Sequence, residues 1–240
     1  MQASPEQQSL VLELQLLDNE IMQANTKLKS LPEVEQLLHI DKRIITATDE
    51  VATVKLEADQ ITLELRRGEV DVETVTDRIK KDEVRLASGN ATPKELEQTQ
   101  HEIQTLKKRQ LALEEIELEI MVRSEAVTER SKVLTTDLAS LETLKAEINQ
   151  RLSAATSEIN SLIATKQKDR QAVAVKIEKV LLDLYEKIRT SSGVGAAALV
   201  GNKCNGCNLA INAVEMQRIK TLPLDEVLRC EECRRILVRI

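Results

Sequence analysis

Apolar side chains recur along most of the chain at alternating spacings of four and three residues. The first run comprises Leu10, Leu14, Leu17, Ile21, Ala24, Leu28 and Leu31. A longer run extends from Leu37 to Leu86, and a third extends from Leu134 to Leu162. This spacing is that of the a and d positions of a coiled coil. The pattern therefore predicts long amphipathic helices that bury one narrow seam.

Helix start and stop signals divide this pattern. Ser4 precedes Pro5, and Gln7 lies three residues after Ser4, which is typical of a capped helix start. Pro32 falls where the seam changes phase, so a kink or short break is predicted near residue 32. The stretch SGNATPKEL, from residue 88, combines turn formers with a second capping box, Thr92 and Glu95. A turn is therefore predicted at residues 88–93.

Two long helices joined by a short turn are expected to pack antiparallel as a hairpin. Folding at this turn pairs residues whose numbers sum to about 182, which would place Gly68 near Leu113. The last turns of the second helix, through Tyr185 and Ile188, would then project beyond the start of the first helix. The alternative is a coiled coil between separate chains.

Composition also favours long helices over a compact domain. The chain of 240 residues contains no Trp or Phe and a single Tyr, so its 42% of hydrophobic residues is supplied almost entirely by aliphatic side chains. Charged residues make up 31%, and no segment has the roughly 20 apolar residues that a membrane-spanning helix needs. The opening MQASPEQQ lacks the basic and apolar regions of a signal peptide. We expect a cytoplasmic protein without a membrane partner, in which thiols stay reduced.

All four cysteines lie near the C-terminus, in two CxxC pairs. Cys204 and Cys207 form the first pair, and Cys230 and Cys233 form the second. Two CxxC turns that face each other supply four thiolates to one tetrahedral Zn²⁺. The spacer is expected to contain a short helix capped by Asn212, and short strands are expected around residues 197–200, at Leu228 and at 235–240. We therefore predict one structural zinc ion per chain, bound by these four residues.

Other readings of the cysteines and of the chain as an enzyme fit less well. A thioredoxin-like CxxC needs a βαβ context that this sequence lacks, and disulfides suit the expected compartment poorly. Four cysteines close the coordination sphere, whereas a catalytic zinc keeps one position open. His39 and His101 fall on opposite arms at positions that should not meet. We expect no enzymatic activity and no small-molecule substrate.

The charge of the chain is unevenly distributed. Residues 193–240 contain seven basic and five acidic residues, a net charge of +2, whereas the other 192 residues carry −8. The candidate nucleic-acid contacts are therefore the basic residues Lys203, Arg218, Lys220, Arg229, Arg234, Arg235 and Arg239. No aromatic residue in this segment can stack on bases, so RNA or DNA binding would be salt-sensitive and weakly selective. The alternative is a scaffold or chaperone-like adaptor that binds proteins along the coiled coil.

The whole chain resembles a bacterial family of coiled-coil proteins with a C-terminal C4-type zinc ribbon. The resemblance rests on the turn in ASGNATPKEL together with CNGC, the spacer helix, and CEEC followed by RIL. The family often has Gly where this chain has Arg234, and His where it has Asn208. The resemblance implies an antiparallel hairpin at 1–192, a ribbon of short strands and one helix at 193–240, and a cytoplasmic regulator or adaptor of nucleic acid or protein. Transcription factors with an acidic coiled-coil tip are a weaker parallel, because residues 88–93 contain no acid.

Overall fold

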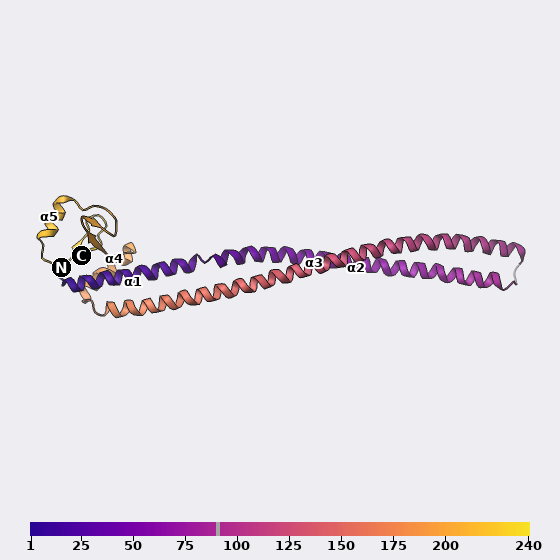
Figure 1. The fold of residues 1–240 in the computed structure, drawn as a ribbon, viewed down its shortest axis with the longest axis horizontal. Helices are drawn as coiled ribbons and strands as arrows, with labels where there is room; N and C mark the ends of the chain where they lie inside the picture. Colours follow the sequence, from indigo (N-terminus) through magenta and orange to yellow (C-terminus); the bar gives the residue numbers. More distant parts are fainter. Residues whose placement is uncertain (90–91) are drawn as a thin grey trace. The chain divides into compact units, whose positions relative to one another are not determined.

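The structure, a computed structural model, describes residues 1–89 and 92–240. The middle of the turn predicted at 88–93 therefore lies outside the described residues. The elements, in chain order, are α1 (Pro5–Lys29), α2 (Pro32–Ala87), α3 (Pro93–Ala174), α4 (Lys179–Ser192), β1 (Ala196–Val200), β2 (Lys203–Cys204), α5 (Ala213–Thr221), β3 (Leu228–Arg229) and β4 (Ile236–Arg239) (Figure 1). The predicted fold class, a long helical hairpin with a small strand-containing ribbon, is confirmed. The chain forms two compact units: Met1–Val34 with Gln150–Ile240, and Glu35–Asn149.

The helix ends lie where the sequence carries its capping residues. The Gln7 N–H donates to Ser4 Oγ at 3.2 Å before α1, and the Thr92 N–H donates to Glu95 Oε2 at 2.8 Å before α3. These side chains satisfy backbone groups that the first helical turn leaves free. α1 ends at Lys29 and α2 begins at Pro32, so the helix is interrupted beside this proline.

In the unit Glu35–Asn149, α2 and α3 run antiparallel along one apolar seam. Two buried clusters lie on it, one around Ile61 and Ile120 and one around Ile79 and Ile103. Ion pairs flank the seam, among them Glu57–Arg130, Glu64–Arg123 and Asp41–Lys145. These contacts within a single chain are those of a hairpin.

The predicted contact of Gly68 with Leu113 is wrong. A Cβ built at Gly68 would lie 3.8 Å from Ile120 Cδ1, one heptad further along α3. In a coiled coil each seam residue sits between layers of the partner helix and can contact either of two residues seven apart. Pairing by a fixed sum of residue numbers ignores this choice.

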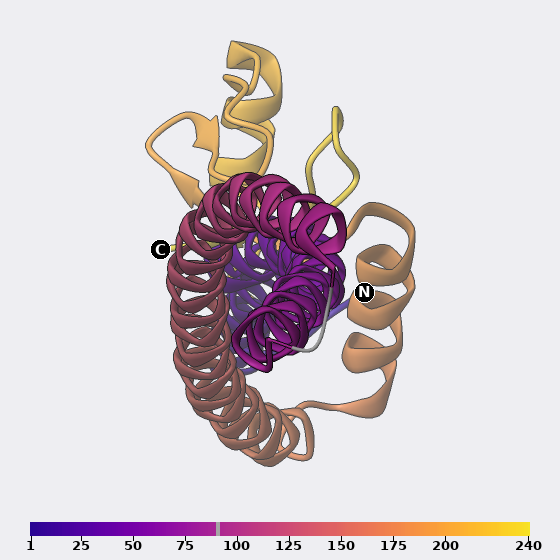
Figure 2. The ribbon, with the colours of Figure 1, turned by 90° about the vertical axis from the view of Figure 1, so that its right-hand side faces the viewer.

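In the other unit, the prediction that Tyr185 and Ile188 project beyond the first helix is also wrong. α3 ends at Ala174, and α4 starts after a short connection (Figure 2). The Gln7 side chain spans this connection, donating to the Lys176 carbonyl at 2.9 Å and accepting from the Glu178 N–H at 2.8 Å. α4 therefore packs beside α1, with Tyr185 and Ile188 in the same buried cluster as Leu14.

The ribbon, residues 193–240, is built on a four-stranded sheet of order β2-β1-β4-β3. β1 and β4 are parallel, and the outer strands pair antiparallel with them. Ala196, Ile236 and Val238 join the core with α1 and α4, whereas Leu199, Ile219 and Leu237 pack around the cysteines. The short strands and the short helix expected in this segment are thus present.

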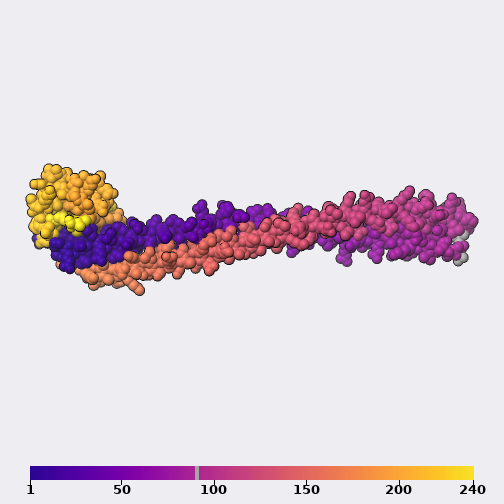
Figure 3. Space-filling model, in the orientation of Figure 1, coloured from indigo at the N-terminus to yellow at the C-terminus, as the bar shows by residue number. Residues whose placement is uncertain are grey.

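The N-terminal residues take part in the ribbon. The Ala3 N–H donates to the Asp225 carbonyl at 2.7 Å, and the Val227 N–H donates to the Met1 carbonyl at 3.0 Å. Figure 3 shows these first residues, in indigo, directly against the yellow C-terminal segment. Gln8, which is 2% exposed, donates to the carbonyls of Ala3 and Leu224.

Across the described residues, no helix has a stretch that is both long and apolar enough to cross a bilayer.

Candidate metal centre

The two CxxC segments form turns with the same backbone hydrogen bonds. In the first, the Cys204 N–H donates to the Leu209 carbonyl, and the Asn208 N–H donates to the Cys204 carbonyl. In the second, the Cys230 N–H donates to the Arg235 carbonyl, and the Arg234 N–H donates to the Cys230 carbonyl. Each turn therefore presents its two sulfurs in the same way.

The sulfur atoms of the four cysteines lie close together. Cys204 Sγ lies 3.8 Å from Cys233 Sγ, Cys207 Sγ lies 3.9 Å from Cys230 Sγ, and all four sulfurs lie within 4.8 Å of one another. A tetrahedral site with Zn–S bonds of about 2.3 Å requires sulfurs roughly 3.8 Å apart. The donor type and the spacing therefore both fit one Zn²⁺.

Without metal, these thiols differ in their affinity for protons. Burial raises the pKa of Cys233 to about 12 and also raises the pKa of Cys204. The backbone N–H of Leu209 instead lowers the pKa of Cys207. Zinc binds the thiolate, so binding must displace protons from at least Cys204 and Cys233.

The residue after each turn has a left-handed backbone. Asn208 has φ 58° and Arg234 has φ 62°. Glycine adopts this conformation freely and asparagine tolerates it, whereas a long side chain is strained there. The family often has other residues at these two positions. The left-handed backbone at Arg234 explains why glycine often follows the last cysteine in that family.

Among the seven basic candidates, Arg218, Arg235 and Arg239 have partners that hold other parts of the ribbon. Arg218 forms an ion pair with Glu215 at 2.5 Å. Arg235 donates to the Gly206 carbonyl, and Arg239 donates to the carbonyls of Ile219, Leu222, Pro223 and Glu226. Arg239 thus satisfies carbonyls at and beyond the C-terminus of α5. These guanidinium groups support the ribbon fold.

The other four basic candidates are exposed. Lys203 and Lys220 form no ion pair among the described residues, and the same holds for Arg229 and Arg234. Arg229 Nε donates to the Arg234 carbonyl, so this pair lies together beside the second CxxC turn, next to Glu231 and Glu232. The structure therefore leaves a scattered set of positive charges, partly offset by neighbouring acids.

A buried polar network joins the ribbon to the helices of its unit. Gln15 Oε1 accepts from the N–H groups of Gly195 and Ala196, at 2.6 and 3.1 Å, and from the Tyr185 hydroxyl at 3.2 Å. Tyr185 also donates to Asp18 at 2.6 Å, and burial raises the pKa of its hydroxyl, which keeps it protonated as a donor. Only glycine fits at 195, because a Cβ there would lie 2.6 Å from the Tyr185 ring.

Charged residues complete this network. Arg170 pairs with Asp18 at 2.7 Å and with Glu186 at 2.5 Å, and Arg189 pairs with Glu186 at 2.8 Å. Sequence reasoning missed this set, although Tyr185 is the single aromatic residue of the chain. An isolated aromatic residue in such a chain is a signal for a specific packing role.

Comparison with known families now identifies the architecture. Residues 14–193 match the CT398-like coiled coil hairpin domain, and residues 203–237 match the C4-type zinc ribbon domain. The chain belongs to the CT398-like coiled-coil hairpin family. The family match and the clustered thiols together fit one structural Zn²⁺, and the protein is a zinc-binding coiled-coil protein.

Relatives extend over the whole chain. The uncharacterized protein Rv2229c of Mycobacterium tuberculosis is 30% identical over 240 residues, covering 100% of this chain and 98% of that protein. A solved Mycobacterium smegmatis structure has a TM-score of 0.83 at 29% identity and full coverage of both chains. CT398 of Chlamydia trachomatis (TM-score 0.62, 19% identity, 98% of each chain) and HP0958 of Helicobacter pylori (0.51, 17%, 99% of this chain and 98% of that one) share the fold.

Proposed function

We propose that the protein is a non-enzymatic adaptor whose zinc ribbon binds a protein partner, with Cys204, Cys207, Cys230 and Cys233 as the four zinc ligands. A four-thiolate site leaves zinc no open position for substrate, which supports a structural role. The division into a hairpin at 1–192 and a ribbon at 193–240 stays a prediction.

A groove beside α5, lined by apolar side chains together with Lys220 and Arg239, carries this proposal. It has a volume of about 620 Å³, and its lining includes Leu199, Met216, Leu222 and Leu224. Leu224 is 68% exposed, and Val214 on α5 is 82% exposed. Apolar groups that stay this accessible on a small domain are typical of protein-binding surfaces.

The electrostatics of the ribbon support a protein partner over a polyanion. Residues 193–240 carry +2 from seven basic and five acidic side chains, and four thiolates around one Zn²⁺ carry −2. The zinc-loaded ribbon is therefore close to electroneutral, whereas nucleic-acid affinity comes mainly from positive charge on phosphates.

A capture experiment tests the adaptor proposal. Zinc-loaded wild-type protein should retain a protein from its native cell extract after nuclease treatment, and Leu224→Asp should lose it. Val180→Asp is the matched control, because Val180 on α4 is also 68% exposed but lies outside the groove. Capture that nuclease abolishes, or that Leu224→Asp leaves unchanged, would contradict the proposal.

Nucleic-acid binding is the second candidate, and the exposed residues Lys203, Lys220, Arg229 and Arg234 support it. With few phosphates neutralised, binding should be weak and its salt slope shallow, about 0.7 to 0.9 per contact. Arg229→Glu with Arg234→Glu should abolish binding of short RNA and DNA in fluorescence anisotropy at low salt. Arg235 is a poor probe, because its guanidinium supports Gly206.

A further inference from the structure

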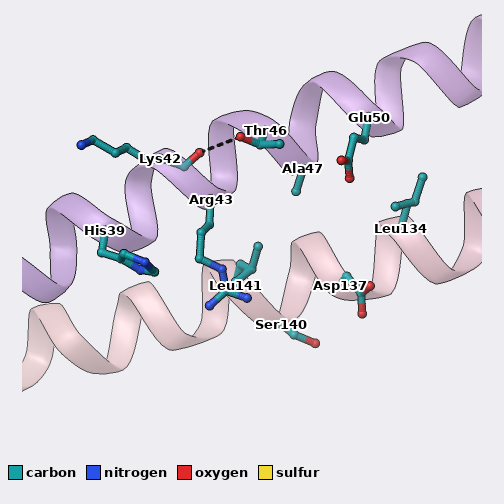
Figure 4. Close-up of a pocket in the computed structure, with 10 residues that line it drawn as sticks. All are labelled: His39, Lys42, Arg43, Thr46, Ala47, Glu50, Leu134, Asp137, Ser140 and Leu141. Atoms are coloured by element: carbon teal, nitrogen blue, oxygen red, sulfur yellow. Dashed lines mark hydrogen bonds between the residues drawn. The ribbon is translucent and has the colours of Figure 1, made fainter.

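A groove in the unit Glu35–Asn149 lies between α2 and α3, and we call it the Ala47 groove. It has a volume of about 600 Å³ and is lined by His39, Lys42, Arg43, Thr46, Ala47, Glu50, Leu134, Asp137, Ser140 and Leu141 (Figure 4). It continues past Glu50 and Leu134 into a second hollow of about 550 Å³. The small side chain of Ala47 occupies the seam position of α2 at this groove.

At one end of the Ala47 groove, α2 and α3 each contribute one acid to the lining. Glu57 pairs with Arg130, and Glu64 pairs with Arg123 one heptad further along α2. One heptad in the other direction, the equivalent positions are Glu50 and Asp137, both exposed. Asp137 thus stands where Arg130 and Arg123 stand in the two neighbouring heptads, so Glu50 has no cation opposite it. Like charges on neighbouring side chains destabilise the helices that carry them.

The opposite end of the groove is basic. His39, Lys42 and Arg43 line it from α2, and Figure 4 shows Arg43 reaching toward α3, whereas the Lys42 amine points away from it. Within the described part of the chain, Lys42 and Arg43 form no ion pair. The groove thus presents free positive charge at one end and unmatched negative charge at the other.

We propose that the Ala47 groove is the interface of a two-fold homodimer. In a two-fold pair each surface patch contacts itself with its direction reversed. An axis between Thr46 and Ala47 would bring Arg43 of each copy to Glu50 and Asp137 of the other. Both acidic ends would then receive the cation that their own chain does not supply.

Side-chain sizes along the groove fit this arrangement. The residues at the axis, Thr46, Ala47 and Ser140, are small, so two helix backbones can approach closely there. Leu134 and Leu141 are half-buried and provide apolar floor on α3.

A second copy explains the groove better than an unrelated partner. A purely basic or purely acidic ligand would match one end and be repelled at the other. A self-complementary patch needs only this sequence, and two-fold dimers are by far the commonest oligomers of soluble proteins.

Charge reversal at the two ends provides the test. Sedimentation velocity of the zinc-loaded full chain at low salt should show a monomer–dimer equilibrium in the micromolar range. Arg43→Glu and Glu50→Lys should each weaken dimerisation about tenfold or more, because each places like charges across the axis. Mixing the two variants should restore the dimer as a heterodimer, because both contacts across the axis then join opposite charges.

Thermal unfolding and two control variants distinguish a loss of folding from a loss of the dimer interface. Glu50→Lys adds a partner for Asp137 within the chain, so its thermal midpoint should not fall. Asp59→Lys and Arg66→Glu reverse two exposed charges that are also seven residues apart on α2 but lie outside the groove. Both should dimerise like wild type.

Three results would overturn the proposal. They are a wild-type protein that is monomeric throughout the micromolar range, a dimer that tolerates both groove variants, and a mixture that does not recover the dimer. A monomeric wild type that binds a foreign helix through Glu50 would assign the groove to another protein instead.

Discussion

Arg234 has φ 62° at a position where most side chains are strained. The backbone needs this conformation because the Arg234 N–H turns back to the Cys230 carbonyl at 2.9 Å. A left-handed non-glycine residue costs roughly 1 kcal/mol. The second zinc turn therefore stores a small strain that the first, with Asn208 at the same position, largely avoids.

Replacing Arg234 with glycine should relieve this strain. We expect Arg234→Gly to stabilise the zinc-loaded ribbon by about 0.5–1 kcal/mol and to slow zinc transfer to a competing chelator. Asn208→Gly is the control and should gain less, because asparagine already tolerates the conformation. Faster zinc loss from Arg234→Gly would contradict this account.

Gln15 is the residue on which the attachment of the ribbon sheet depends. Its Oε1 atom accepts from two backbone N–H groups and from Tyr185, and its side chain is buried. Gln15→Ala leaves the N–H groups of Gly195 and Ala196 without this acceptor, whereas Tyr185 keeps Asp18, and each unsatisfied buried group costs about 1–3 kcal/mol. Hydrogen exchange at Gly195 and Ala196 should accelerate strongly, whereas Gln23→Ala, at an exposed position of α1, should leave it unchanged.

At the scale of elements, the features that depend on local sequence were predictable. The apolar spacing predicted the seams, Thr92 and Glu95 predicted the start of α3, and Asn212 predicted α5, whose Glu215 N–H donates to Asn212 Oδ1 at 2.7 Å. The end of α3 at Ala174 was not predictable, because it depends on Gln7, which lies far away in the sequence.

In the candidate metal centre, too, some features were predictable from the sequence and others were not. The cysteine spacing predicted the thiol cluster, since metal ligands must converge whatever the rest of the fold does. The roles of the basic residues were not predictable, because Arg235 and Arg239 are held by carbonyls that only the folded ribbon brings near them. Sequence shows the charge of a side chain but not its partner.

The pairing of α2 with α3 within one chain can be tested directly. Val75 and Leu106 belong to one apolar cluster, so cysteines placed there, in a background without the native four, should be joined by a short thiol crosslinker within one chain. Denaturing gels should show a monomer of altered mobility. Crosslinking found only between chains would contradict the hairpin.

At the scale of the whole molecule, the zinc site makes ribbon stability depend on metal and on pH. Zinc analysis should give one ion per chain, and replacing any of the four cysteines with Ser should loosen the metal while helicity stays nearly constant. The ribbon should then become sensitive to protease, because metal binding supplies much of the folding free energy of such small domains.

The pH dependence follows from the raised thiol pKa values. Burial raises the pKa of Cys233 to about 12 and raises that of Cys204, so both thiols are protonated in the metal-free site at neutral pH. Zinc must displace these protons, so the apparent zinc affinity should rise with pH and fall on acidification. Chelator competition across the neutral range measures this, and a pH-independent affinity would contradict the four-thiolate assignment.

The hydrogen bonds between residues 1–3 and residues 225–227 have a consequence for the order of events during synthesis. Met1 and Ala3 are synthesised long before their partners Val227 and Asp225. Helical segments close local contacts early, but a contact between segments so far apart in sequence waits until the later one has been made. The ribbon therefore completes its fold only after residues 225–227 have been synthesised. A chain that stops before residue 224 leaves the Ala3 N–H without its carbonyl acceptor and the buried Gln8 side chain without one of its two acceptors.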